Sequence, residues 1–242
     1  MKGTVLYEVN DGVAVLTVDN PPVNPLSDGV RNGLYESLQK AEDDNTVKGV
    51  VLTGKGRAFI AGADISEFGG NVEGKSLNEV FQKLEFCKKP VVAAINGIAL
   101  GGGLETALCC NYRIIDKSAI VGLPEVNLGL LPGGGGTQRL PRLAGPSEAL
   151  KMMLTGSHVP AQKALNLGIV NSISDDVVAE SIEFIKEVAE KTDDHPKVRD
   201  FNEKMMEARG DDKVLLEAQA IASKGRKGQF APGQIIKCVE TA

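Results

Sequence analysis

The sequence predicts an α/β fold with a helical C-terminal segment, and three observations support this expectation. Strand candidates rich in β-branched residues alternate with helical segments in the first part of the chain, which is typical of crossover connections. Beyond Thr137 most segments have helical patterns. The 242 residues suffice for one large domain with a smaller appendage. We therefore expect a core over residues 1–191 and a helical C-terminal segment over residues 192–242.

The expected elements follow in chain order. Residues 4–19 contain two strand candidates around Asp11 and Gly12, a pair that accepts positive φ in a hairpin turn. Ser27 is expected to cap a helix over residues 28–43. The remaining candidates are strands over residues 48–54, 91–95, 112–116 and 118–122, and helices over residues 145–156, 160–168 and 174–191.

Composition excludes several classes of function. The net charge of -5, with both signs interspersed, leaves no basic stripe for nucleic acid. Four cysteines without Cys-x-x-Cys spacing and two histidines disfavour a metal site, and no apolar run has membrane-spanning length. We expect a soluble, intracellular protein with Cys109 and Cys110 as buried thiols, and with His158 and His195 solvated or capping.

The segment "GGNVEGKS", from Gly69 to Ser76, fits the pattern of a phosphate-binding loop. Such a loop needs a buried strand directly before it, whereas the preceding "AGADISEF" contains Asp64 and Glu67. Ser76 and Glu79 instead fit a capping box at a helix start. The pattern therefore disfavours nucleotide hydrolysis.

Two glycine-rich segments contain candidate catalytic groups. "NGIALGGGLETAL" places Glu105 in the first helical turn after three glycines, where unpaired amides could bind an oxyanion; the alternative is a surface acid that compensates the helix dipole. Glu125 lies among apolar residues before a four-glycine turn. It is either a solvent-facing loop acid or a carboxyl whose pKa is raised in an apolar pocket. Two carboxylates and an amide site together would suit proton transfer beside a carbonyl.

Four segments, in order and at the usual spacing, resemble the signatures of the crotonase (enoyl-CoA hydratase/isomerase) superfamily. They are "AGADISEF", "GIALGGGLETAL", "PEVNLGLLPGGGGTQRLPRLAG" and "PAQKALNLGIVNSI". The resemblance implies a crotonase-like spiral of ββα units. It also implies an enoyl-CoA hydratase of fatty-acid β-oxidation that adds water across the trans-2 double bond, with Δ3-Δ2-enoyl-CoA isomerisation left open. Coenzyme A would enter as part of the substrate, with no separate cofactor.

The resemblance also assigns residues. It implies an oxyanion hole from the amides of Ala63 and Gly102, a main proton-transfer role for Glu125 and a water-binding role for Glu105. Arg57 is the candidate for contacts with the CoA moiety, ahead of Lys75, and no metal site is implied. The substrate-binding positions carried over are Ala61, Gly62, Asp64, Ile65, Gly101, Pro132 and Gly133.

The segment "KGQFAPGQIIKCVETA" resembles the connector after the hydratase part of multifunctional β-oxidation enzymes. This resemblance implies an N-terminal hydratase/isomerase part attached to a C-terminal dehydrogenase part, or otherwise a homo-oligomer such as a trimer. If a covering helix is missing, apolar surface should be exposed. The alternative function is then an acyl-CoA-binding fragment inactive through truncation. The expected location is the bacterial cytoplasm, with the peroxisome or the mitochondrial matrix as alternatives.

Overall fold

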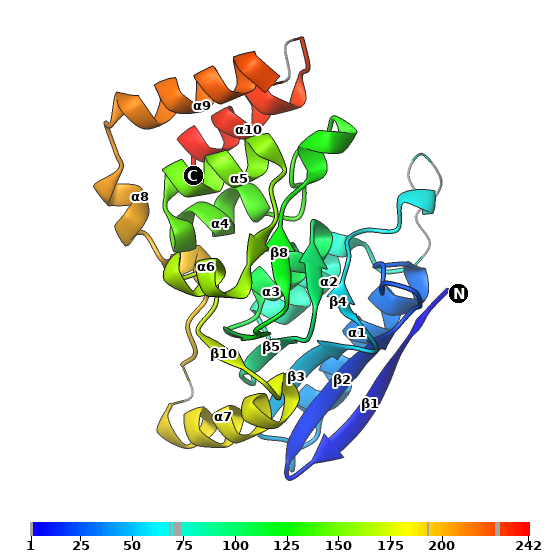
Figure 1. The fold of residues 1–242 in the computed structure, drawn as a ribbon. Coiled ribbons are helices and arrows are strands. Elements are labelled where there is room, and N and C mark those ends of the chain that lie inside the picture. The colour runs from blue at the N-terminus through cyan, green and yellow to red at the C-terminus, as the bar shows by residue number, and fades with distance from the viewer. Residues whose placement is uncertain (1, 68, 70–73, 193, 226–227) are drawn as a thin grey trace.

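Two β-sheets form the centre of the computed structural model, which describes residues 2–67, 69, 74–192, 194–225 and 228–242 (Figure 1). The strands are β1 (Thr4–Asn10), β2 (Val13–Asp19), β3 (Gly49–Gly54), β4 (Ala58–Ile60), β5 (Val91–Ile95), β6 (Ile98–Leu100), β7 (Tyr112–Asp116), β8 (Ile120–Gly122), β9 (Val159–Pro160) and β10 (Ser172–Ser174). The larger sheet has the order β1-β2-β3-β5-β7-β10, and the smaller sheet β4-β6-β8-β9. The pairs β1–β2 and β8–β9 are antiparallel, and all other pairs are parallel.

The helices complete a repeating pattern. They are α1 (Asp28–Asp43), α2 (Leu77–Glu85), α3 (Gly102–Cys109), α4 (Gly136–Ala144), α5 (Pro146–Thr155), α6 (Ala161–Asn166), α7 (Val177–Lys191), α8 (Glu203–Glu207), α9 (Asp212–Gly225) and α10 (Ala231–Glu240), with short 3-10 helices η1 (Ile65–Glu67), η2 (Glu125–Leu128) and η3 (Val198–Asp200). Three times, one strand joins the larger sheet, the next joins the smaller sheet, and a helix follows: β3-β4-α2, β5-β6-α3 and β7-β8-α4. The predicted spiral of ββα units is thereby confirmed.

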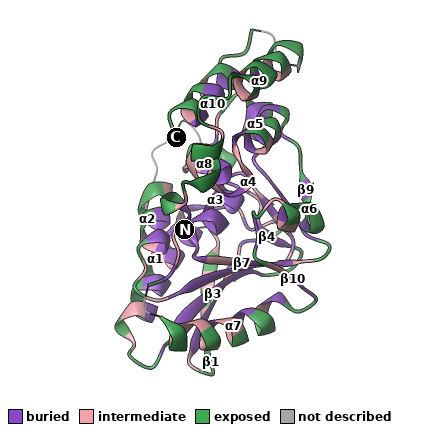
Figure 2. Ribbon diagram, turned by 90° about the vertical axis from the view of Figure 1, so that its left-hand side faces the viewer, coloured by how far each residue is buried: buried purple, intermediate pink, exposed green. Residues whose placement is uncertain are grey.

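The central strands β3 and β5 of the larger sheet are buried on both faces, which explains why they are almost entirely apolar. One face packs Val51 and Val92 against α7, where Ile185 is fully buried. The opposite face places Leu52 and Ala93 in the main core. Figure 2 shows these strands as buried ribbons between helices whose outer faces are exposed.

The C-terminal helices pack on the α4–α5 pair rather than on a sheet (Figure 1). Helix α7 ends at Lys191, and the described residues after it form only helical elements and loops. The division into a core over residues 1–191 and a segment over residues 192–242 stays a prediction.

The local predictions have mixed outcomes. The hairpin turn is confirmed, with φ of 51° at Asp11 and 78° at Gly12. Ser27 is the N-cap residue of α1, as predicted, although its side chain makes no capping hydrogen bond. Its hydroxyl donates to the Lys2 carbonyl and accepts from Asn20 instead. The N-terminal residues thus cover the start of α1.

The histidine prediction is half wrong. His158 is exposed, as expected, whereas His195 is buried and its Nδ1 lies 3.3 Å from the Tyr112 hydroxyl. The Tyr112 ring also meets the imidazole edge to face. His195 is buried by tertiary packing of the segment after α7, which the neighbouring sequence does not reveal. Cys109 and Cys110 are buried free thiols, as predicted.

A close backbone contact joins β4 to the start of α3. A Cβ added at Gly103 would lie 1.9 Å from the Ile60 carbonyl oxygen, a distance that real Cβ atoms essentially never show. Only glycine lets the helix approach the strand this closely. The contact places the end of β4 beside the N-terminus of α3.

Substitution of Gly103 by alanine should therefore lower the free energy of unfolding by about 1–3 kcal/mol, because the added methyl group must push backbone apart. The matched control is Gly233→Ala in α10, where an added Cβ meets nothing within 4 Å. That change should raise stability by about 0.4–1 kcal/mol through helix propensity and unfolded-state entropy. Chemical denaturation of both variants measures the difference, and equal effects at the two positions would contradict the close contact.

Candidate active site

Two backbone amides lie at the junction of β4 and α3. Gly102 is the first residue of α3, and a Cβ built on it would lie 3.4 Å from the Ala63 nitrogen. Ala63 is held beside it because Leu26 pairs with the 62–63 backbone, its amide donating to the Gly62 carbonyl at 2.9 Å. Within the described part of the chain neither the Ala63 nor the Gly102 amide has a hydrogen-bond acceptor. Two free donors side by side, one at a helix N-terminus, suit an oxyanion.

Glu105 points from the first turn of α3 into the interior, where it is 3% exposed. Its Oε1 accepts hydrogen bonds from the amides of Gly134 at 2.7 Å and Gly136 at 2.8 Å. Burial raises the pKa of the Glu105 carboxyl above its usual range, while these two amides and the Arg139 charge oppose that rise. This burial excludes the alternative that Glu105 is a surface acid compensating the helix dipole.

Glu125 begins the short helix η2 and is partly buried. Its Oε2 is buried and has no hydrogen-bond partner among the described residues. Burial, followed by the charge of Glu105, raises the pKa of Glu125 to about 8. The side chain reaches the α3 start, since a Cβ on Gly101 would lie 3.3 Å from its Oε1. The two carboxyl groups therefore share one site and differ in hydrogen bonding.

A cavity of about 370 Å³ adjoins the Ala63 amide and the 133–134 backbone. Of the positions expected to bind substrate, Asp64 and Gly133 line it together with Ala63. Its other lining residues are Leu26, Arg31, Glu67, Ser76, Leu77, Asn78 and Gly134. The cavity lies next to the amide pair and is mostly apolar, as is usual for small-molecule sites.

The other expected binding residues have different environments. Gly62 and Pro132 are buried, Gly101 is buried with φ of 53°, and Ala61 is partly buried. Ile65 in η1 is 61% exposed, and Arg57, which directly precedes β4, is also exposed. Asp64 turns back to its own loop, where its Oδ1 accepts from the Ser66 amide and hydroxyl. A ligand role for these residues stays a prediction.

The described part of the apparent phosphate loop caps helix α2. Residues 70–73 lie outside the described part of the chain, as does residue 68. Ser76 and Glu79 form the predicted capping box of α2. Lys75 lies within 3.0 Å of Glu79 and over the Tyr35 ring, and the 3-10 helix η1 precedes this segment in place of a buried strand. The requirement of a phosphate loop for a preceding strand is not met.

Local sequence patterns do not reveal the groups that hold Glu105. Gly134 and Gly136 are predicted only as part of a turn, although their amides are the donors to Glu105. Arg139 is also not predicted as a site residue, although it forms an ion pair with buried Glu85 and donates to the Gly134 carbonyl. The sequence feature that could have indicated these groups is the four-glycine turn directly before a helix that contains an arginine.

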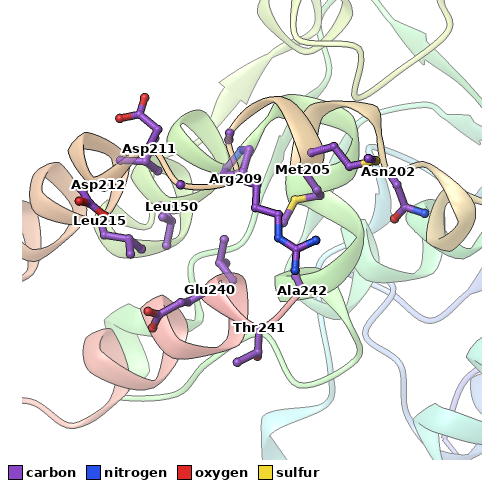
Figure 3. Close-up of a pocket in the computed structure, with 16 residues that line it drawn as sticks. Leu150, Asn202, Met205, Arg209, Asp211, Asp212, Leu215, Glu240, Thr241 and Ala242 are labelled. Carbon is purple, nitrogen blue, oxygen red and sulfur yellow. The ribbon is translucent and has the colours of Figure 1, made fainter.

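A larger cavity, of about 820 Å³, lies among α5, α8, α9 and α10 (Figure 3). Its charged side chains, Arg209, Asp211, Asp212 and Glu240, are exposed, and neither Glu105 nor Glu125 lines it. Size alone does not make it the reactive centre, because it lacks convergent buried polar groups. Among the described residues no group of three His, Cys, Asp or Glu side chains could hold a metal ion. No helix within them is both long and apolar enough to cross a bilayer.

Comparison with known proteins gives a consistent set of relatives. The enoyl-CoA hydratase/isomerase family profile matches residues 8–228. A peroxisomal bifunctional enzyme of Danio rerio is 49% identical over 180 residues, which are 74% of this chain and 25% of that protein. The fatty acid oxidation complex subunit alpha of Shewanella frigidimarina is 42% identical, over 95% of this chain and 34% of its own length. A probable enoyl-CoA hydratase of Bacillus subtilis is 45% identical, over 76% and 73%.

Solved structures agree with the sequence relatives. The enoyl-CoA hydratase of Bacillus anthracis superposes with a TM-score of 0.73 at 29% identity, covering 95% of this chain and 99% of that one. An enoyl-CoA hydratase structure from Geobacillus kaustophilus gives a TM-score of 0.70 at 32% identity, covering 95% and 98%. The chain spans about a quarter to a third of the length of its multifunctional relatives, at 25% and 34% for the two named above.

The raised pKa of Glu125 makes a prediction about stability. Its pKa is near 4.5 in an unfolded chain and about 8 in the fold, so the folded state binds more protons between these values. The contribution of Glu125 to stability is therefore fully present below pH about 4.5 and is lost as pH rises through about 8. Glu125→Gln, which cannot ionise, should gain thermal stability relative to the parent protein between pH 5 and pH 9. A difference in melting temperature that stays constant over this pH range would contradict the assignment.

Proposed function

The chain belongs to the enoyl-CoA hydratase/isomerase family, and from this premise we propose that it is an enoyl-CoA hydratase of fatty-acid β-oxidation. It would add water across the trans-2 double bond of an enoyl-CoA thioester. The observation that supports this reaction most directly is the pair of buried carboxyl groups, Glu105 and Glu125, beside two unpaired backbone amides.

The amides of Ala63 and Gly102 would receive the thioester oxygen. Attack at C3 moves electrons through C2 into the carbonyl, so negative charge grows on that oxygen in the transition state. Donors fixed by the β4–α3 contact need little reorganisation as this charge develops. The apolar cavity beside Ala63 would take part of the acyl-CoA chain.

The two carboxyl groups would divide the proton transfers. Ionising one disfavours ionising the other, and two amides with Arg139 favour the charge on Glu105. Glu125, with a partnerless buried oxygen and a pKa of about 8, would keep the shared proton at neutral pH. The Glu105 carboxylate would hold the water and take its proton as hydroxide adds to C3. Glu125 would deliver its proton to C2, and one proton passing from Glu105 to Glu125 restores the pair.

Attachment and location remain part of the proposal. The relatives named as bifunctional enzymes and as a fatty acid oxidation complex subunit are much longer than this chain, which agrees with attachment to a C-terminal dehydrogenase part. A homo-oligomer is the other arrangement. A bacterial cytoplasmic location, or else a peroxisomal or mitochondrial one, is proposed on the strength of bacterial and peroxisomal relatives.

Crotonyl-CoA tests the reaction directly. Loss of the conjugated thioester absorbance should be fast in the parent protein. Glu105→Gln and Glu125→Gln should each lower kcat by ~10²–10⁴-fold, because each removes one proton-transfer group. Circular dichroism checks that both variants are folded.

The exposed Glu79→Gln serves as the control for a glutamate outside the site and should leave turnover unchanged. If the folded parent protein binds a CoA thioester without turnover, the alternative of an acyl-CoA-binding fragment replaces the hydratase.

Isomerisation of Δ3- to Δ2-enoyl-CoA and hydration should depend on pH in opposite senses. Here Glu125 alone would take a proton from C2 and return it to C4, so it must start as the carboxylate. Isomerase turnover should rise as pH passes about 8, while hydration, which needs protonated Glu125, should fall. Parallel assays with 3-enoyl-CoA and 2-enoyl-CoA thioesters from pH 6 to pH 9.5 measure the ratio. Isomerisation that is lost in Glu105→Gln as completely as in Glu125→Gln would refute the single-residue shuttle.

A further inference from the structure

We propose that Arg139 is a positioning residue that holds the Gly134 amide against Glu105 and favours the ionised form of that carboxyl group. Arg139 would act through the Gly134 loop and would not contact the reacting atoms. The inference rests on the proposed role of Glu105 and adds to it the device that orients this side chain.

The guanidinium of Arg139 is fixed on one side by Glu85. Its Nε and Nη2 donate to the two carboxylate oxygens of Glu85, both at 2.9 Å. Glu85 is the last residue of α2 and is 3% exposed, and the Arg139 side chain is 13% exposed. A two-pronged, largely buried pair of this kind defines the orientation of the guanidinium plane.

The third nitrogen of the same guanidinium reaches the loop that holds Glu105. Arg139 Nη1 donates to the Gly134 carbonyl at 3.0 Å, and the amide of Gly134 donates to Glu105 Oε1 at 2.7 Å. Gly134 thus accepts a hydrogen bond from Arg139 with its carbonyl and donates one to Glu105 with its amide. Glu85 of α2 is therefore connected to the Glu105 carboxylate through Arg139 and the Gly134 backbone. Every hydrogen bond in this connection is 2.7–3.0 Å long.

The loop has little room to shift. A Cβ on Gly134 would lie 2.2 Å from the Phe81 ring and 2.7 Å from Glu105 Oε2, so this backbone is wedged between them. A Cβ on Gly135, which has φ of 94°, would lie 2.2 Å from Arg139 Nη1. Steric fit limits the loop on two sides, and the Arg139 bond fixes the direction in which the Gly134 peptide points.

The charge of Arg139 acts on Glu105 as well. The charged or titratable groups around it are Glu85 on α2, Glu105 and Cys109 on α3, Arg142 on α4, and Arg199 on η3. Burial raises the pKa of Glu105, and the positive charge of Arg139 opposes this rise. Glu85 neutralises only part of that charge at Glu105, because it binds the far side of the guanidinium.

A buried ion pair is weak support for stability, since well-packed apolar residues often do as well. The link from this pair to a reactive carboxylate therefore favours a positioning role. A stabilising role alone would change folding, whereas positioning would change kcat and the pH profile in a protein that still folds.

The test compares Arg139→Met with Arg139→Lys in hydration of crotonyl-CoA. Arg139→Met should lower kcat by ~10–10²-fold, with a smaller change in KM, because Glu105 is misplaced while the thioester site is intact. Without the positive charge the pKa of Glu105 rises, so the acid limb of kcat/KM should move to higher pH. Arg139→Lys keeps the charge and loses the two-pronged bond, so it should lower kcat while leaving the acid limb near its parent position.

Lys151→Met is the control, since this largely exposed cation of α5 lies 3.9 Å from Glu148 and is not among the charged groups around Arg139. It should change neither the acid limb nor kcat. Should Arg139→Met fold poorly because Glu85 is left charged and buried, Arg139→Met with Glu85→Gln removes that charge and should show the same loss.

A double variant separates this inference from the proposed function. If Arg139 acts through Glu105, adding Arg139→Met to Glu105→Gln should cost no further kcat. An equal loss of kcat in both backgrounds, or an unmoved acid limb in Arg139→Met, overturns the positioning role. Full turnover by Glu105→Gln itself would instead refute the role of Glu105, and the inference with it.

Discussion

The site depends on one close backbone contact, between the end of β4 and the start of α3. Gly103 lets the Ile60 carbonyl approach α3 at a distance that no side chain allows. This contact puts the Ala63 and Gly102 amides side by side and turns Glu105 inward from the first turn of the helix. Because the same strand–strand–helix step occurs before α2 and α4, the fold brings the ends of successive strands to one edge. Glu125 and the 133–136 loop follow strands β7 and β8, the next pair along the chain.

The two carboxyl groups obtain different properties from the same buried environment. Both lose solvation, but Glu105 receives two amide donors from the glycine loop and has a cation nearby. Glu125 has a buried oxygen without a partner, and burial together with the charge of Glu105 outweighs the one hydrogen bond from its own backbone amide. In the proposed reaction this difference would let two chemically identical groups start as base and acid at the same pH. The glycine loop would then be part of the chemistry, because its amides favour ionisation of Glu105 over Glu125.

Sequence patterns predicted what is determined locally and failed where distant packing decides. The turn at Asp11, the capping box at Ser76 and the place of Glu105 in a first helical turn follow from a few neighbouring residues. The amides that hold Glu105 are 29 and 31 residues away in sequence, and Glu85 is 54 residues from Arg139. Burial of His195 likewise depends on Tyr112, which lies 83 residues earlier. The pairing of Ala63 with Gly102 came only from family resemblance, because no local pattern relates two amides on separate segments.

The C-terminal segment supports the site although it contributes none of the proposed reacting groups. Arg199 lies 3.3 Å from Glu85, and its carbonyl accepts from Arg142 on α4. Gln138 of α4 donates to the Cys238 carbonyl of α10 at 2.8 Å. Helix α4 supplies both the Gly136 amide and Arg139, so these contacts hold the element that orients Glu105. A change in this segment would therefore reach the proposed chemistry through the position of α4, whereas the Ala63 and Gly102 amides, fixed by β4 and α3, would keep their place.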